Sequence, residues 1–235
     1  MSEEANLDLK SSLVSYNDLN KLTQMSKVPD QVISFDTEFF SFGDEISLIS
    51  LGMVTDRGDA LYIVPPDIDN TIRKIQDIVH GKSVLNQSTP IYRQYLSNAK
   101  WLTENVVPNI YNPHTPIIPS SNKEFQEIVT LFCGTSPQFW AYISSYDWVV
   151  LRQMWGSIVD GPRHWPYSVN DLAVILGILN LKSKDFPQDT PDVLPNHNAL
   201  ADAYWGYKVR KTFLEWNDDG SKDIAFRTLL NFKIR

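Results

Sequence analysis

The sequence is poor in the residues that form cross-links and structural metal sites. Its 235 residues include one cysteine, Cys133, and four histidines that are far apart along the chain. A single cysteine excludes an internal disulfide, and the scattered histidines argue against a structural zinc site, which needs several Cys or His ligands at close spacing. We therefore expect a fold held together by its apolar core, in a reducing cytoplasm.

Long hydrophobic runs and excess positive charge are also missing. The longest apolar-rich stretch, residues 172–179, is far too short to span a bilayer, and the acidic residues 1–10 lack the apolar segment of a secretory signal. The net charge of −7 argues against broad coating of nucleic acid, which needs many Lys and Arg contacts with phosphates. An enzyme that holds only a strand end is still allowed, because bound cations would cancel several of these acids.

The length and composition fit one globular domain. Apolar residues make up 43% of the chain, which is enough for a sizeable core. We expect residues 1–30 to be an extension with a short helix at 16–25, and residues 31–216 to be the domain. Residues from about 82 to 120 have the character of an insertion, and residues 217–235 form a tail whose apolar side chains are candidates for a homodimer contact.

The order of elements predicts an α/β layered domain with a mixed sheet. Three strands follow one another directly and suggest an antiparallel meander, after which helices alternate with a fourth strand. The expected strands are 31–36, 46–54, 60–64 and 138–143. The expected helices are 71–80, 92–106, 121–132, 147–155, 169–179 and 197–216.

Three short segments carry the chemistry of this chain, because each places an acid at the edge of an apolar segment. They are Phe35-Asp36-Thr37-Glu38, Ser145-Tyr146-Asp147-Trp148 and the run from His197 to Asp202. Each has a plain structural alternative when taken alone. The first pair of acids can face water at a strand end, Asp147 can be a helix N-cap, and the last pair can lie on an exposed helix start.

The combination favours a metal site over these alternatives. Asp36 and Glu38 are two residues apart, so strand alternation sends both side chains to one face. All the candidate residues are expected at element ends, where α/β sheets place their sites. Four carboxylates facing one point would repel each other unless cations lay between them. That arrangement suits a pair of hard divalent ions and the cleavage of phosphodiester bonds.

The set Asp36, Glu38, Asp147, His197 and Asp202, in this order, resembles the DEDDh group of DnaQ-like 3′-to-5′ exonucleases. Over residues 31–212 the chain is most similar to small bacterial and phage exoribonucleases of that group. The runs that carry this similarity are 101–108, 139–156, 162–166 and 197–205. The resemblance implies a ribonuclease H-like fold, with an antiparallel first part of the sheet and a parallel strand beside it, in a cytoplasmic protein of a bacterium or phage.

The resemblance also implies a mechanism. Asp36 would bridge two Mg²⁺ or Mn²⁺ ions, Glu38 and Asp202 would complete the site that holds the attacking water, and Asp147 would help to hold the second ion. His197 would accept the proton of that water as general base. The products would be nucleoside 5′-monophosphates released from the 3′ end of a strand, with RNA favoured over DNA.

Two further residues are candidates for substrate binding. Phe39 follows the first acidic pair and can stack on the terminal base, although core packing is an equal alternative. Arg163 can contact phosphate or form a structural salt bridge. Three other functions compete with the exoribonuclease: a proofreading-like DNA exonuclease, a non-catalytic nucleic-acid-binding module of the same fold, and a glycosidase that uses two carboxylates.

Overall fold

The computed structural model describes residues 12–15, 18–43, 45–82, 88–112, 114–157, 159–186, 195 and 197–218. The chain beyond residue 218, including the apolar segment considered for a homodimer, lies outside these residues, and so does the start of the N-terminal extension. No helix in the described part of the chain has the length and apolar character needed to cross a bilayer.

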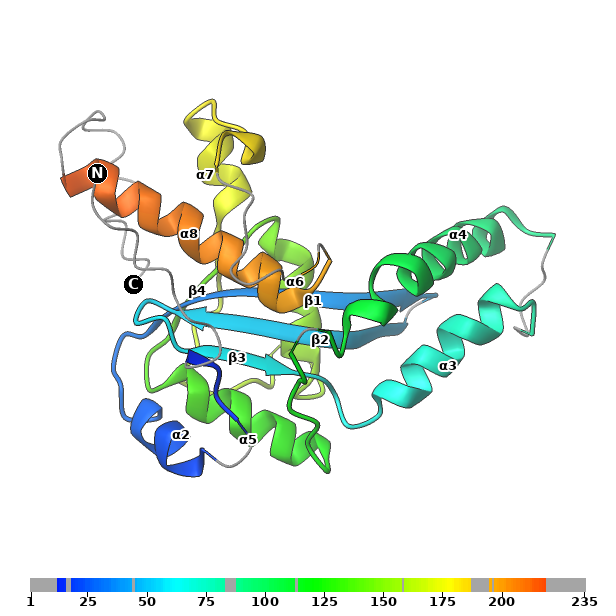
Figure 1. Ribbon diagram of the computed structural model, residues 1–235, viewed down its shortest axis with the longest axis horizontal. Helices are drawn as coiled ribbons and strands as arrows, with labels where there is room; N and C mark the ends of the chain where they lie inside the picture. Colours follow the sequence, from blue (N-terminus) through cyan, green and yellow to red (C-terminus); the bar gives the residue numbers. More distant parts are fainter. Residues whose placement is uncertain are drawn as a thin grey trace.

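A five-stranded mixed sheet forms the centre of the protein (Figure 1). Its order is β3-β2-β1-β4-β5; β1 to β3 pair antiparallel, whereas β4 and β5 run parallel to β1. The strands are β1 Val32–Phe42, β2 Glu45–Thr55, β3 Ala60–Ile63, β4 Gln138–Ala141 and β5 Asn170–Asp171. The predicted mixed sheet is confirmed: an antiparallel meander of three strands is continued by two parallel strands.

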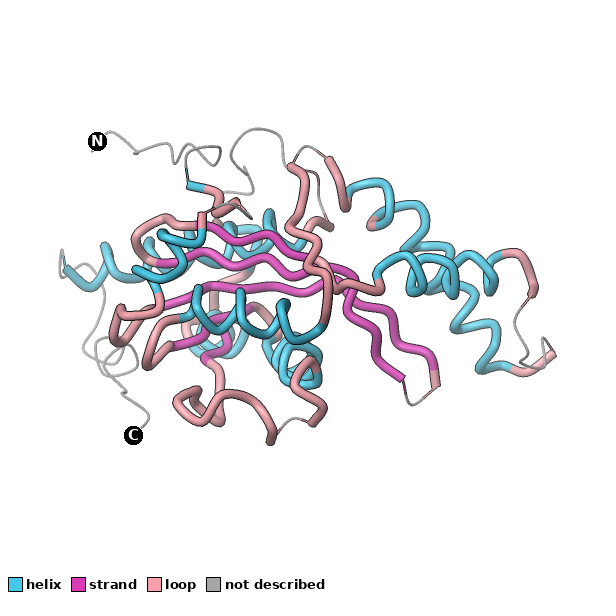
Figure 2. Tube along the Cα trace, turned by 90° about the horizontal axis from the view of Figure 1, so that it is seen from below, coloured by secondary structure: helices cyan, strands magenta, loops and turns pink. Residues whose placement is uncertain are grey.

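Strand β1 is longer than the sequence indicated. The apolar pattern predicted an end at Asp36, but β2 pairs with β1 as far as Phe42, with a bulge between Glu38 and Phe39. The two acids therefore lie inside a strand, and the prediction that they mark its end was wrong. The far part of the β1–β2 hairpin extends past the other strands (Figure 2).

Helices cover both faces of the sheet. Helix α8, Ala199–Asp218, crosses β1 and β2 on one face, and α7, Leu172–Ile178, packs beside it through an apolar cluster that includes Leu172 and Phe213. The other face is covered by α2, Leu19–Met25, by α5, Asn122–Cys133, and by α6, Ser144–Gln153. Figure 1 shows α8 on one side of the sheet and α2 and α5 on the other. A short 3₁₀ turn, η2, occupies Ser183–Asp185.

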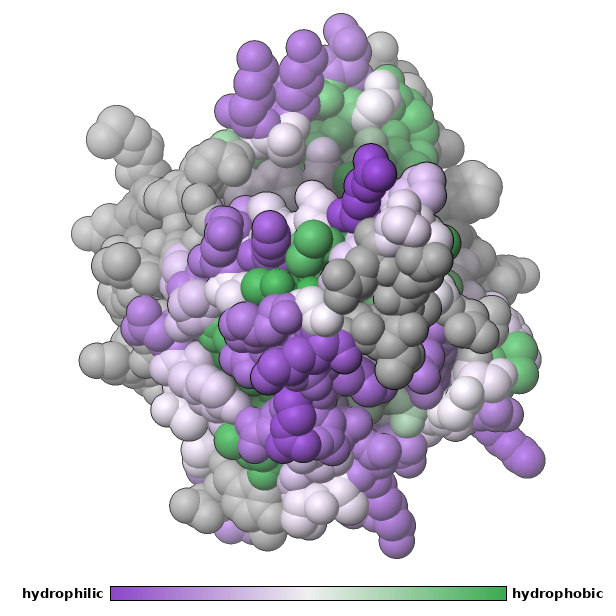
Figure 3. All heavy atoms as spheres, turned by 90° about the vertical axis from the view of Figure 1, so that its right-hand side faces the viewer, coloured by the Kyte–Doolittle hydropathy of each residue, from purple (hydrophilic) through white to green (hydrophobic). Residues whose placement is uncertain are grey.

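Two helices form an arm that packs on the extended hairpin. They are α3, Ile68–Val79, and α4, Pro90–Asn105, and the 3₁₀ turn η1, Val107–Asn109, follows them. We call α3 and α4 the α3–α4 arm. Its buried apolar residues form a cluster with Phe40 of β1 and Ile49 of β2, separate from the cores beside the sheet. The described surface at this end of the molecule is mostly hydrophilic (Figure 3), as expected for helices that bury only their inner faces.

Candidate active site

Strand β1 directs its two acids toward helix α8. Ser34 lies near Gly206 of α8, and side chains two apart on a strand share a face. Asp36 and, before the bulge, Glu38 therefore face α8. This is the shared orientation of the two carboxylates that their spacing predicted.

A glycine opposite Asp36 allows α8 to begin directly on the sheet. Gly52 is the cross-strand partner of Asp36 on β2. A Cβ atom at Gly52 would overlap the carbonyl oxygen of Ala199, the first residue of α8. Only glycine leaves room for this approach. It brings the first turn of α8, which contains Asp202, beside the acids of β1.

Asp147 reaches the same place from α6. The helix begins three residues before Asp147, at Ser144, so the alternative interpretation of Asp147 as an N-cap was wrong. Its Oδ1 instead accepts two hydrogen bonds from Thr37, one from the backbone N–H at 3.0 Å and one from the hydroxyl at 2.6 Å. Thr37 lies between Asp36 and Glu38, so these bonds fix α6 to β1 at the acidic pair.

The helix start is held by a residue that the sequence did not point to. Asp171 of β5 accepts hydrogen bonds from the backbone N–H of Ser144 at 2.8 Å and from its hydroxyl at 2.9 Å. Its other carboxylate oxygen accepts from Ala173 and caps α7. One side chain of a two-residue strand thus sets where α6 begins, and with it the position of Asp147.

The electrostatics show that the four carboxylates lie together. Burial raises the pKa of Asp36 well above its ordinary value, and the charges of the other three acids raise it further. Burial and the charges of Asp202 and Asp147 raise the pKa of Glu38 to about 8. Burial also raises the pKa of Asp147 to about 6, against the lowering effect of its bonds from Thr37. Strong shifts of this kind among clustered acids are typical of functional sites.

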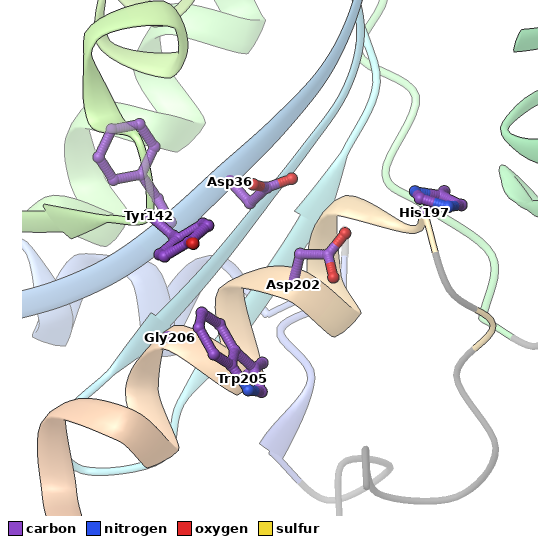
Figure 4. Close-up of a pocket in the computed structure, with 7 residues that line it drawn as sticks. Asp36, Tyr142, His197, Asp202, Trp205 and Gly206 are labelled. Carbon is purple, nitrogen blue, oxygen red and sulfur yellow. The ribbon is translucent and has the colours of Figure 1, made fainter. Parts of the chain in front are cut away.

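His197 completes the cluster at the start of α8. The residue precedes the helix, has a left-handed backbone with φ +60°, and is exposed. Ligand atoms of Glu38, His197 and Asp202 lie within 4.8 Å of one another, close enough to share a metal ion. Burial raises the pKa of Asp202 to about 6, while the nearby His197 opposes this shift. Figure 4 shows Asp36 on the strand, Asp202 on the helix and His197 just before it.

The buried Asn198 fixes the backbone next to His197. Its Oδ1 accepts hydrogen bonds from the N–H groups of Leu200 at 3.0 Å and Ala201 at 3.4 Å, which caps α8. Its Nδ2 donates to the carbonyl oxygen of Asn109 at 3.0 Å and to the hydroxyl of Tyr62 at 3.1 Å. The helix was predicted to begin at His197, but this cap makes Ala199 its first residue.

A cavity of about 400 Å³ opens beside the acids (Figure 4). Carboxylates and His197 line one part of it, and aromatic rings line another. The rings of Tyr142 and Trp205 meet edge to face, with centroids 5.3 Å apart. Its lining residues are Phe35, Asp36, Tyr142, His197, Asp202, Trp205 and Gly206. Such a site offers oxygen ligands for hard cations next to aromatic surface.

The two predicted substrate-binding residues differ in their placement. Phe39 is partly buried and stacks on Tyr146, with ring centroids 6.5 Å apart and 24° between the planes. Tyr146 was not predicted from the sequence, although it directly precedes Asp147, because its 64% exposure depends on the fold. Arg163 is exposed in the loop before β5 and is not among the residues that line the cavity. The structure therefore does not bring Arg163 to the acids.

Comparisons with known proteins give matches in sequence and in structure. No protein-family model matches the chain. Two curated proteins named 3′-5′ exoribonuclease, from Mycobacterium tuberculosis strains CDC 1551 and H37Rv, are each 24% identical to it over 172 residues. These matches cover 72% of this chain and 84% of each relative. The sequence similarity thus extends over most of each protein.

A solved structure gives a weaker match. It is the catalytic unit of Neurospora crassa Pan2, with its protease and nuclease domain, at a TM-score of 0.45 and 18% sequence identity. The match covers 87% of this chain but only 30% of that chain.

Proposed function

We propose that this protein is a metal-dependent 3′-to-5′ exoribonuclease of the DEDDh group. The observation that carries the proposal is the convergence of four carboxylates from β1, α6 and α8. Burial raises the pKa values of all four, and the charges of neighbouring acids raise those of Asp36, Glu38 and Asp147 further. The activity named for the two mycobacterial relatives supports the reaction and the preference for RNA.

The residues present suit two divalent cations. All four acids offer the oxygen ligands that Mg²⁺ and Mn²⁺ prefer. Burial and the charges of neighbouring acids raise the pKa values of Asp36 and Glu38, and a bound cation would offset both effects. Asp36, Glu38, Asp147 and Asp202 would together hold the ions. When bound, the ions would stabilise the attacking and leaving oxygens of an in-line displacement.

His197 is the proposed general base. Its imidazole lies beside Asp202 and Glu38, at the edge of the acidic cluster. In this role it takes a proton from the water that attacks the terminal phosphodiester. An imidazole is a common general base near neutral pH.

Three residues are proposed to contact the 3′ end of the RNA. Phe39 and the exposed Tyr146 present stacked rings next to Glu38 and Asp147, and such rings can receive the terminal base. Arg163 is proposed to contact phosphate further along the strand, because its exposed side chain leaves the guanidinium accessible. The substrate would be the 3′ end of a single-stranded RNA.

The proposal is tested by following end-labelled strands. RNA and DNA of the same sequence, single-stranded and with 3′ overhangs, are incubated with Mg²⁺ or Mn²⁺. We expect a 5′-labelled RNA to shorten stepwise from its 3′ end with release of nucleoside 5′-monophosphates, and the DNA to react more slowly. Internal cuts, or the absence of metal-dependent release from either strand, would contradict the proposal; faster cleavage of DNA would instead favour the proofreading-like enzyme.

Gly52→Ala should lower the activity by about 10²-fold, because its Cβ would displace the start of α8 and misplace His197 and Asp202 relative to Asp36. The rate at saturating RNA and the melting temperature would be measured for this variant and for Gly177→Ala. Gly177 lies in α7, and a Cβ added there would meet open space, so that variant should keep full activity. Equal rates for the two variants would show that the close approach at Gly52 has no catalytic importance.

A further inference from the structure

Helix α4 of the arm contacts the proposed general base directly. Trp101, in the last turns of α4, packs its indole against the imidazole of His197, with ring centroids 4.7 Å apart and an angle of 73° between the planes. Trp101 is 41% exposed, so burial in a core does not account for its position. This edge-to-face geometry is a favoured one for aromatic rings.

The backbone beside His197 is tied to the same part of the chain. The side-chain amide of Asn198 donates to the carbonyl oxygen of Asn109 in η1, which follows α4. Asn198 also donates to the hydroxyl of Tyr62, and this hydroxyl donates to the carbonyl oxygen of Ile110 at 3.0 Å. The ring and the adjoining backbone of His197 are thus supported by two successive segments, α4 and the turn after it.

These contacts matter because His197 lies outside α8, so the orientation of its imidazole depends on the residues around it. His197 precedes the first residue of the helix, is exposed, and has a left-handed backbone. Its ring lies near the carboxylates of Glu38 and Asp202 and also packs against Trp101. A general base works only within hydrogen-bond reach of the proton it accepts, so a fixed ring orientation has a direct effect on rate.

We propose that Trp101 is a positioning residue that holds the imidazole of His197 toward the acidic cluster, so that the α3–α4 arm is a working part of the catalytic centre. This inference rests on the proposed exonuclease activity and deepens it. It assigns a catalytic purpose to an arm whose buried residues form a cluster of their own outside the main sheet cores.

The test combines kinetics with a double-mutant cycle on the full chain. Trp101→Ala should lower kcat on RNA by about tenfold to hundredfold, a part of what a general base contributes, with KM changed less than about twofold. Trp101→Phe should recover most of the rate, because it restores an aromatic contact. In the His197→Ala background the change of Trp101 to alanine should have no further effect, since a positioning residue acts only through its partner.

A matched control and a spectroscopic measurement separate this inference from the proposed function. Ile91→Ala, which removes another exposed apolar side chain from α4, should leave kcat unchanged. In NMR spectra of the wild type, the indole should shift the His197 ring protons, and Trp101→Ala should abolish that shift whether or not the protein cleaves RNA. The inference would be overturned if Trp101→Ala left the chemical shifts of the His197 ring protons unchanged, or if the effects of the two substitutions on kcat simply added. A raised KM with kcat retained would also overturn it, because Trp101 would then contact the RNA. Failure of the wild type to release nucleotides would count against the proposed function instead.

Discussion

Asp147→Asn should reduce nucleotide release by roughly 10³-fold or more while the protein stays folded. Asparagine has almost the same shape as aspartate, and its Oδ1 can still accept the two hydrogen bonds from Thr37 that fix α6 to β1. What disappears is the negative charge. The cation that this carboxylate is proposed to help hold would bind more weakly, and the charge developing on the phosphate would lack its stabilisation.

The comparison needs a variant that loses an acid elsewhere. Asp30→Asn serves this purpose, because Asp30 is exposed before β1 and its left-handed backbone, with φ +50°, is one that asparagine adopts readily. Rates at saturating RNA, circular dichroism and thermal melting would be recorded for both variants. Full activity in Asp147→Asn would remove Asp147 from the metal site, whereas loss of the folded state would show that Thr37 requires a charged acceptor.

Removal of divalent ions should abolish activity and lower the melting temperature. Each ion that binds only the folded protein, at a concentration of one hundred times its Kd, stabilises it by about 2.7 kcal/mol. For a chain of this size that corresponds to roughly 5–10 °C in melting temperature. Thermal melts with a chelator and with added Mg²⁺ measure this difference, and identical curves at pH 8 would mean that the carboxylates do not bind cations as proposed.

The effect of metal on stability should also depend on pH. The pKa values of Asp147 and Asp202 are raised to about 6 and that of Glu38 to about 8, from ordinary values of 3.8, 3.8 and 4.5. The metal-free folded protein therefore binds more protons than the unfolded chain, and its stability should fall as the pH rises from about 4 to about 8. Cations compete with those protons, so the stabilisation by Mg²⁺ should be small at pH 5 and large at pH 8.

Local sequence patterns predicted the parts of this site that depend on short spacing. The orientation of Asp36 and Glu38 follows from the alternation of a strand, which holds wherever the strand ends. The meander was predictable because its three strands are consecutive in the chain. The gathering of Asp147 and Asp202 with this pair was predicted only from the order of the motifs and the family resemblance, because neither has a local signal stronger than a helix start.

The residues that no local pattern pointed to act over long separations. Gly52 matters because Ala199 lies against it, and Asp171 matters because it binds the first residue of α6. Trp101 and Tyr146 are large aromatic residues that are exposed close to site residues, and no sequence pattern predicts the exposure of a side chain. Strand β1 continues beyond its apolar run, which ends at Asp36, because β2 pairs with it as far as Phe42. Strand pairing rather than composition therefore decides where β1 ends.

The stacked pair of Phe39 and Tyr146 has a consequence for protein engineering. Phe39 and Tyr146 stack on each other, each beside a site acid in the sequence, and Tyr146 is largely exposed. Asp36, in contrast, lies opposite Gly52, where the backbone of Ala199 fits closely. Selection for altered nucleotide preference can therefore draw on libraries at Tyr146 with little loss of folded protein, whereas changes at Phe39 also disturb its packing against the main core cluster. Libraries that include Gly52 would return mostly inactive clones, because any side chain there would overlap the backbone of Ala199.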